Sequence, residues 1–288
     1  MQLKEGIKIY IDTPLPEDRI YLSNGLKAME RTYRGMQCLE GGFMPQKPWR
    51  KPNNEERNLL FAPSETQMNY RETVGIVKLP SEIITYCQKM PIAEADSEDA
   101  FKAIQQNQTY DYMALTSAID AFVDQYASSL YDRHCIGFHL GNPGFEVGTI
   151  DSNTGQLIGL HIDSWDKLPT HEAINATNRI CFNMGSEDRY FLMINQSLEA
   201  IAQMLHQKDA SLPASLEQYT RPQLLKTFFK NYPEYPAIRI RLKPYEAYIA
   251  PTENIIHDGD LSEKVAPDVT YTIRGYLDVQ PKTLENIS

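Results

Sequence analysis

A histidine and an aspartate stand two residues apart in the segment 159–163 (GLHID), which ends a predicted strand. Side chains two apart in an extended chain point to the same side, so His161 and Asp163 can bind one ion together. His257 ends another strand-like run much later in the chain. Two imidazoles and a carboxylate on one face of an octahedron leave three positions open, which suits Fe(II), dioxygen and a bidentate cosubstrate. These three residues are the candidate metal ligands and catalytic residues.

A threonine and an arginine share one face of a predicted strand near the C-terminus, at Thr272 and Arg274. The planar fork of an arginine matches a carboxylate in bidentate fashion, and a hydroxyl two residues away can bind the same anion. The pair is therefore a candidate cradle for the distal carboxylate of 2-oxoglutarate, although a strand arginine is also commonly a solvated charge or one half of an ion pair. Asn183 is a further cosubstrate candidate, and an ordinary strand residue is the alternative.

The order of these residues resembles a known family. His161-x-Asp163, then His257, then Arg274 is similar to the HxD…H…R motif of Fe(II)/2-oxoglutarate-dependent oxygenases. The segment 249–259 (IAPTENIIHDG) also looks like the distal-histidine region of bacterial members. The resemblance covers roughly residues 134–280 and implies a double-stranded β-helix, Fe(II) as cofactor and 2-oxoglutarate as cosubstrate.

The same resemblance implies a reaction. Family members decarboxylate 2-oxoglutarate to succinate while they oxidise an unactivated C–H bond of a second substrate. Halogenases of the family carry a small residue where Asp163 stands, so the resemblance implies hydroxylation, or a related desaturation or ring closure. The implied targets are small molecules, such as an amino acid, its derivative or a peptide residue. Trp165 is a candidate for lining the substrate pocket, and the candidates for holding an anionic substrate are Arg189, Arg239 and Arg241.

Two other classes of protein stay open, because an HxD pair alone occurs by chance in many chains. One is a non-catalytic jelly-roll protein that binds a ligand or a metal. The other is a non-haem iron enzyme that uses no 2-oxo acid. The chain has no HExxH, GxSxG, Walker A or GxGxxG motif, which argues against the corresponding hydrolases and nucleotide-binding proteins.

Strand signals dominate residues 134–280. Runs at 145–150 and 156–162 flank the turn signature DSNTG, and runs at 179–184 and 190–194 flank GSED, so each pair predicts a hairpin. Helices are predicted near 196–207 and 221–231, the second beginning at Thr220 and Pro222. Further strands are expected at 238–242, 247–250, 255–257 and 269–277. The pattern predicts a jelly-roll or cupin-like core with a helical insertion near 196–231.

Residues 1–133 are predicted to be mainly helical. Apolar residues at three- and four-residue steps indicate a helix over 110–132, and shorter helices are expected around 18–33, 80–90 and 97–107. The stretch 41–70 is rich in Pro, Asn and Glu and is expected to be an irregular loop. We expect an α+β protein with one oxygenase domain over residues 1–288. Its N-terminal helices would pack on one sheet as a buttress and substrate lid.

Composition limits the partners. The chain of 288 residues carries 38 acidic and 28 basic side chains, a formal net charge of −10, so it would repel nucleic acid. Four widely spaced cysteines, the absence of an apolar leader and the absence of a long apolar run indicate a cytoplasmic protein that does not enter a membrane. The sequence carries no signal for an oligomeric state.

Overall fold

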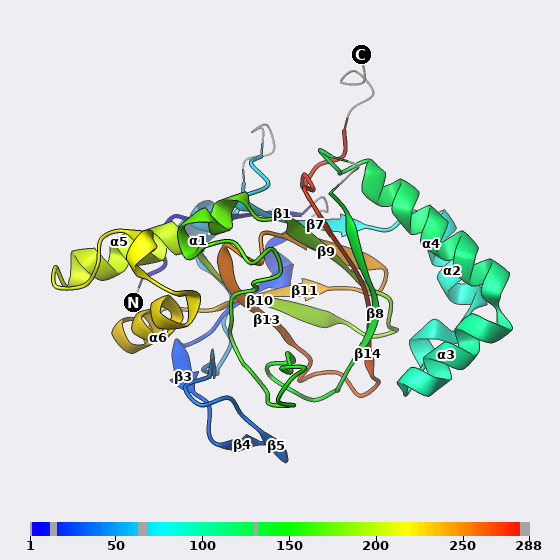
Figure 1. Ribbon diagram of the computed structural model, residues 1–288, viewed down its shortest axis with the longest axis horizontal. Helices are drawn as coiled ribbons and strands as arrows, with labels where there is room; N and C mark the ends of the chain where they lie inside the picture. The colour runs from blue at the N-terminus through cyan, green and yellow to red at the C-terminus, as the bar shows by residue number, and fades with distance from the viewer. Residues whose placement is uncertain (1, 12–15, 63–67, 130–131, 283–288) are drawn as a thin grey trace.

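Two β-sheets form the centre of the molecule in a computed structural model, which describes residues 2–11, 16–62, 68–129 and 132–282 (Figure 1). The larger sheet contains, in spatial order, β1 (Lys8–Ile11), β7 (Thr73–Lys78), β12 (Glu246–Ala250), β9 (Asn178–Asn183), β14 (Asp268–Gly275) and β8 (His134–Gly141). The smaller sheet contains β13 (Ile255–Asp260), β10 (Arg189–Ser197), β11 (Ile238–Leu242) and β2 (Ile20–Leu22). Strands β1 and β7 are parallel, and the other neighbours in these two sheets are antiparallel.

One core lies between the two sheets and a second lies outside the larger sheet. Phe191 of β10 stacks on Tyr248 of β12 with ring centroids 4.2 Å apart, which joins the inner faces of the two sheets. On the outer side, Ile180, Phe182 and Tyr271 belong to the second core. It is covered by α2 (Ser81–Lys89), α3 (Glu98–Asn107) and α4 (Thr109–Asp124), as Figure 1 shows. The predicted packing of N-terminal helices on one sheet is confirmed.

The strand β14 shows how the sequence divides its side chains between two environments. Tyr271 and Ile273 point to the helices, whereas Thr270 and Thr272 line a cavity between the sheets. Thr272 is paired with Cys181 of β9, and Cys181 is paired with Tyr248 of β12. This alternation follows from the two-residue period of a strand, and it brings polar inner side chains from three strands side by side.

Three more helices lie at the other end of the sheets: α1 (Asn54–Leu60), α5 (Leu198–Lys208) and α6 (Arg221–Asn231). Each begins with a polar cap, since the side chains of Asn53, Ser197 and Thr220 accept hydrogen bonds from backbone N–H groups of the first turn. Thr220 forms a capping box with Gln223, and Pro222 lies in the first turn. The predicted start of the helix at Thr220 is therefore confirmed, as are both helices of the insertion.

Short elements complete the described chain. They are β3 (Leu26–Ala28), β4 (Thr32–Tyr33), β5 (Met36–Gln37), β6 (Phe43–Pro45), η1 (Pro16–Arg19), η2 (Pro91–Glu94), η3 (Thr170–Asn175) and η4 (Leu216–Gln218). Pairs β3–β6 and β4–β5 form two small antiparallel sheets of their own.

The N-terminal half is less helical than predicted. The helix expected over 18–33 is wrong, because Ile20 and Leu22 are fully buried while Tyr21 between them is half-buried, the alternation of an edge strand. The loop expected over 41–70 contains β6 and α1, and its residues 63–67 lie outside the described chain. Strands β1, β2 and β7 thus come from the region that was predicted to be mainly helical.

Both predicted hairpins need correction. Residues 145–150 and 156–162 flank a real turn, with the Asp151 N–H bonded to the Gln156 carbonyl, but they form only isolated bridges. Strands β9 and β10 are not partners, because one belongs to the larger sheet and the other to the smaller. The turn signature correctly predicted where the chain reverses. However, β9 and β10 are each buried on both faces, and each of them pairs with strands of a different sheet.

Within the described residues, no helix is both long enough and apolar enough to cross a membrane.

Candidate metal centre

The three predicted ligands meet at one point. Ligand atoms of His161, Asp163 and His257 all lie within 4.8 Å of one another, with Asp163 and His257 buried. The Nε2 atoms of His161 and His257 lie 3.6 and 3.7 Å from the Asp163 carboxylate. The chain segments that carry the histidines are joined by a pair of backbone hydrogen bonds, 3.0 and 2.8 Å long, between His161 and His257. This bridge adds the 161 segment to the edge of β13.

The imidazoles are oriented by their other nitrogens. His161 donates from Nδ1 to the Gly159 carbonyl at 2.9 Å, and His257 donates from Nδ1 to the Ile255 carbonyl at 3.4 Å. Both Nε2 atoms are thereby directed toward Asp163. A carbonyl partner on the far nitrogen is the usual arrangement behind a metal-bound histidine.

Two polar atoms of the cluster are buried without a hydrogen bond, His257 Nε2 and Asp163 Oδ2. Unpaired buried acceptors are costly, and a cation between the three side chains would satisfy both. Two nitrogen donors and one carboxylate with free positions are a donor set for Fe(II) and related divalent metals. The residues present therefore fit a metal ion.

Protonation favours metal binding at two of the three ligands. Burial raises the pKa of Asp163, but Arg179 at 3.0 Å and the two histidines outweigh it, so its pKa is held well below the usual value. Burial lowers the pKa of His257 to about 3, so this imidazole is neutral at pH 7. Burial also lowers the pKa of His161, yet the adjacent Asp163 reverses the shift and the pKa is raised. Among the three ligands, His161 is therefore the one at which a metal ion competes most with a proton.

A cavity of about 500 Å³ adjoins the triad. His257 and Thr272 line it, and so do Arg179 and Arg189 from the inner faces of β9 and β10. The part away from the triad contains the buried Arg189, whose Nε lies 3.2 Å from Asp268. Lys264 is also buried and lies 3.3 Å from the same carboxylate. Two cations therefore share one anion at this end of the cavity.

Arg274 has partners that exclude the role predicted for it. Its guanidinium lies 2.6 Å from Asp166 and 2.8 Å from Glu253, donates to the Thr177 hydroxyl and sits over the ring of Trp165. Two carboxylates already neutralise it, so a third, from a cosubstrate, would be repelled. The assignment of Arg274 to a cosubstrate cradle is corrected, whereas Thr272 of the same pair does line the cavity.

The acidic partners of Arg274 lie close in sequence to two candidate metal ligands: Asp166 follows Asp163, and Glu253 precedes His257. The Asp166 N–H donates to Glu253 at 2.8 Å, and Asp166 accepts from the Thr177 N–H at 2.6 Å. The Asp163 N–H donates to the Thr252 carbonyl at 3.1 Å. Arg274 thus ties the turn after Asp163 to the segment before β13.

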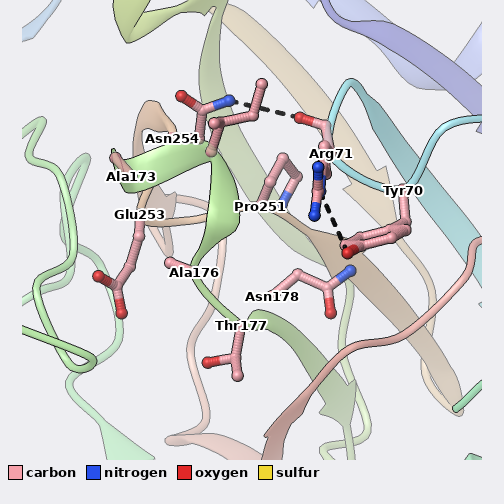
Figure 2. Close-up of a pocket in the computed structure, with 10 residues that line it drawn as sticks. Tyr70, Arg71, Ala173, Ala176, Thr177, Asn178, Pro251, Glu253 and Asn254 are labelled. Atoms are coloured by element: carbon pink, nitrogen blue, oxygen red, sulfur yellow. Dashed lines mark hydrogen bonds between the residues drawn. The ribbon is translucent and has the colours of Figure 1, made fainter. Parts of the chain in front are cut away.

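A narrow crevice lies on the far side of this network, and Figure 2 shows it. The side chains of Glu253 and Thr177 point away from the contact at the top of the picture, where Asn254 donates to the Arg71 carbonyl at 3.4 Å. Arg71 donates in turn to the Tyr70 hydroxyl at 3.1 Å. The crevice has no room for a water molecule, so it serves packing and is not a second site.

Asn183 is the other correction. Its amide is fully buried, donates to the Glu187 carbonyl at 2.9 Å and accepts from the Gly185 N–H at 3.2 Å. These bonds shape the turn after β9 and leave Asn183 no part in the cavity. Of the arginines proposed for an anionic substrate, Arg239 pairs with Asp260 and Arg241 with Asp188, both outside the cavity, while Arg189 lies inside it.

Arg179 is a residue of the site that the sequence did not mark out. The sequence placed Arg179 on one face of a predicted strand. Its role became visible only in the structure, where its guanidinium lies 3.0 Å from the carboxylate of Asp163, a residue distant from it in the strand pairing. Trp165 lines the cavity as predicted.

Comparison of the chain with protein-family models, with curated proteins and with solved structures gives no match.

Proposed function

We propose that the protein is an Fe(II)/2-oxoglutarate-dependent oxygenase that hydroxylates, or otherwise oxidises, an unactivated C–H bond of a small molecule. The observation that carries the proposal is the triad of His161, Asp163 and His257, in which two buried acceptor atoms have no hydrogen bond and which adjoins a cavity. Away from the triad, two buried cations, Arg189 and Lys264, share the one carboxylate of Asp268. A bound Fe(II) would supply activation of dioxygen, which oxidises both the 2-oxo acid and the substrate.

The strand order supports a double-stranded β-helix. The order β8-β14-β9-β12 in one sheet faces β13-β10-β11 in the other, and the 161 segment bridges to the free edge of β13. This is the order expected when two Greek keys wind into a jelly roll. The sharing of one sheet by β1, β7 and β12 supports a single domain over both halves of the chain.

Arg189 is the residue that we assign to the distal carboxylate of 2-oxoglutarate, in place of Arg274. It lies on β10 four residues from Met193, the residue that pairs with His257, so it lines the cavity at a distance from the metal ligands. Thr270 and Thr272 line the same cavity and can donate hydroxyl hydrogen bonds. Asp268 and Lys264 leave this cluster with one net positive charge, which a carboxylate would neutralise.

The protein's own residues have distinct tasks in the reaction. His161, Asp163 and His257 would hold the metal, and Arg179 keeps Asp163 ionised. Arg189 would fix one end of the 2-oxo acid so that its keto acid end faces the triad. The walls of the cavity would orient the C–H bond and exclude water.

Anaerobic titration tests the proposal. Protein with Fe(II) and 2-oxoglutarate should develop the weak visible charge-transfer band of the chelate, and oxygen should then release succinate. His161→Ala and Asp163→Ala should abolish both signals while circular dichroism stays native, whereas His171→Ala, a half-exposed histidine outside the cavity, should change neither. Undiminished succinate release in either triad variant would refute the metal site. Metal binding without a band would favour an iron protein that uses no 2-oxo acid, and a band without succinate would favour a non-catalytic binding protein.

A further inference from the structure

The mouth of the metal cavity gathers exposed apolar side chains. Among the described residues, eight large hydrophobic side chains are exposed, and three of them line this cavity. They are Ile136, Ile150 and Trp165, with 40%, 37% and 52% of their surface exposed. A single exposed apolar residue is ordinary, but a group of them at the entrance of one cavity marks a binding surface.

The three residues come from separate parts of the chain. Ile136 lies on β8, the edge strand of the larger sheet, which runs beside β14 in Figure 1. Ile150 precedes the turn at 151–155, and Trp165 follows the metal ligand Asp163 by two residues. Because Trp165 is only two residues from the candidate metal ligand Asp163, the exposed apolar residues border the place where oxidation would occur.

Charge is distributed unevenly along the cavity. The lining residues next to Ile150 in the chain are uncharged: Gly148, Thr149 and Ser152. The charged lining residues Arg179, Arg189 and Asp268 lie on the inner faces of β9, β10 and β14. Arg179 is paired with Asp163 at the triad, whereas Arg189 and Lys264 share Asp268 at the inner end of the cavity, where β14 begins. The surplus positive charge therefore lies at the inner end, away from the exposed apolar residues of the mouth.

Two further titratable residues, Asp258 and His139, line the cavity. Asp258 is buried, and its Oδ1 accepts from the Thr149 hydroxyl at 2.8 Å and from three backbone N–H groups. Desolvation lowers the pKa of His139, against the opposing effect of Asp268, so its ring is neutral at pH 7. Asp258 Oδ2 is enclosed without a hydrogen bond, but Arg179 is paired with Asp163, so a carboxylate that entered the mouth would lose water without gaining a free cation.

We propose that this mouth binds an uncharged apolar or aromatic group of the substrate, and that a free zwitterionic amino acid is not the substrate. The inference rests on the proposed function, because it assigns the inner end to 2-oxoglutarate and the mouth to the molecule that is oxidised. A total volume of about 500 Å³, shared with the cosubstrate, admits one ring or a short alkyl chain. The substrate class is therefore a small apolar compound, or a derivative whose charges are masked or lie outside the cavity.

The experiment compares two molecules with the same ring and different charge. 2-Phenylethanol and phenylalanine are titrated into protein loaded with Zn(II), an inert replacement for Fe(II), and 2-oxoglutarate, and binding is followed by ligand-observed nuclear magnetic resonance. 2-Phenylethanol should bind at least about tenfold more tightly, since the amino acid has to desolvate two charges. Equal or tighter binding of phenylalanine, or no binding of 2-phenylethanol at millimolar concentration, would overturn the inference.

Variants locate the binding. Trp165→Ala should weaken 2-phenylethanol binding about tenfold, and Ile136→Ala and Ile150→Ala about threefold each, in proportion to the apolar contact removed. The isoleucine variants are needed because Trp165 also contacts Arg274 and its removal can disturb the metal turn. Met113→Ala, which removes an exposed apolar side chain outside the cavity, is the control and should change nothing. Unchanged binding in all three mouth variants would sink the proposal.

The two proposals fail separately. Binding of 2-phenylethanol is measured without oxygen and without turnover, so it can succeed when the Fe(II)–2-oxoglutarate band is absent. That result would remove the oxygenase and keep an apolar pocket. A normal band with succinate release, but with preference for phenylalanine, would keep the oxygenase and remove the apolar mouth.

Discussion

The two ends of strand β14 each hold a buried arginine cluster, and the clusters differ in charge. At the C-terminal end, Arg274 and Arg221 face two carboxylates, Asp166 and Glu253, so positive and negative charges balance. At the N-terminal end, Arg189 and Lys264 share the single carboxylate of Asp268. The first cluster is complete, and the second has one positive charge to spare.

This difference in charge indicates that Arg274 and Arg189 have different roles. A balanced buried cluster fixes geometry, because any further ion would enter it without a partner. A cluster with excess charge, next to a cavity, can bind an anion from outside. Arg274 therefore holds the turn that carries Asp163, and Arg189 is the arginine that the proposed function assigns to 2-oxoglutarate.

The largest effect is expected at the unbalanced cluster. Arg189→Met should weaken 2-oxoglutarate binding by about 100-fold or more, because the buried carboxylate of the cosubstrate would lose its charged partner. The affinity for Mn(II), measured by electron paramagnetic resonance, should stay unchanged. Lys264 still neutralises Asp268, so the fold should survive. If 2-oxoglutarate binds the variant as well as the parent protein, the contrast between the two clusters is lost.

A smaller effect is expected at the balanced cluster, and there it concerns the affinity for the metal and not the affinity for 2-oxoglutarate. Arg274→Met should weaken Mn(II) binding by roughly 10- to 100-fold, since residues behind a metal ligand typically contribute that much. Arg274→Lys should recover only part of it, because an ammonium cannot bridge two carboxylates as a guanidinium does.

Arg19→Met is the matched control for Arg274→Met. It breaks a buried ion pair with Glu246 whose two hydrogen bonds are both 2.8 Å long, but which lies outside the metal cavity. It should lower the melting temperature without changing Mn(II) affinity. Equal metal affinity in the Arg274 variants and this control would show that Arg274 stabilises the fold alone.

The smallest effect is a difference in pH dependence within the balanced cluster. Burial raises the pKa of Asp166, but the Thr177 N–H and Arg274 outweigh it and the pKa is lowered, so its stabilisation is present above the unfolded pKa and is lost in acid. Burial raises the pKa of Glu253, so its contribution is largest in acid and declines as pH rises through the folded pKa. The loss of melting temperature in Asp166→Asn should grow from about pH 3 to 5, whereas that in Glu253→Gln should shrink from about pH 4 to 7. Parallel profiles for the two variants would contradict these assignments.

Much of the architecture was predictable because it depends on local periodicity. The apolar stripe at 110–132 predicted α4, which occupies Thr109–Asp124, and Thr220 with Pro222 predicted the start of α6. Strand β11 was predicted at its observed bounds, residues 238–242. Strand β2 escaped prediction, since Ile20 and Leu22 gain their burial beside β11, far along the chain.

The sequence alone identified the three candidate metal ligands, because a two-residue spacing in extended backbone directs the side chains of His161 and Asp163 to the same side. Only the tertiary structure decided which arginine was free. A guanidinium is available or occupied according to the carboxylates around it, and Asp166, Glu253 and Asp268 reach their arginines through contacts between distant parts of the chain. Whether an arginine is already paired depends on distances of a few ångströms, and the amino-acid sequence does not contain these distances.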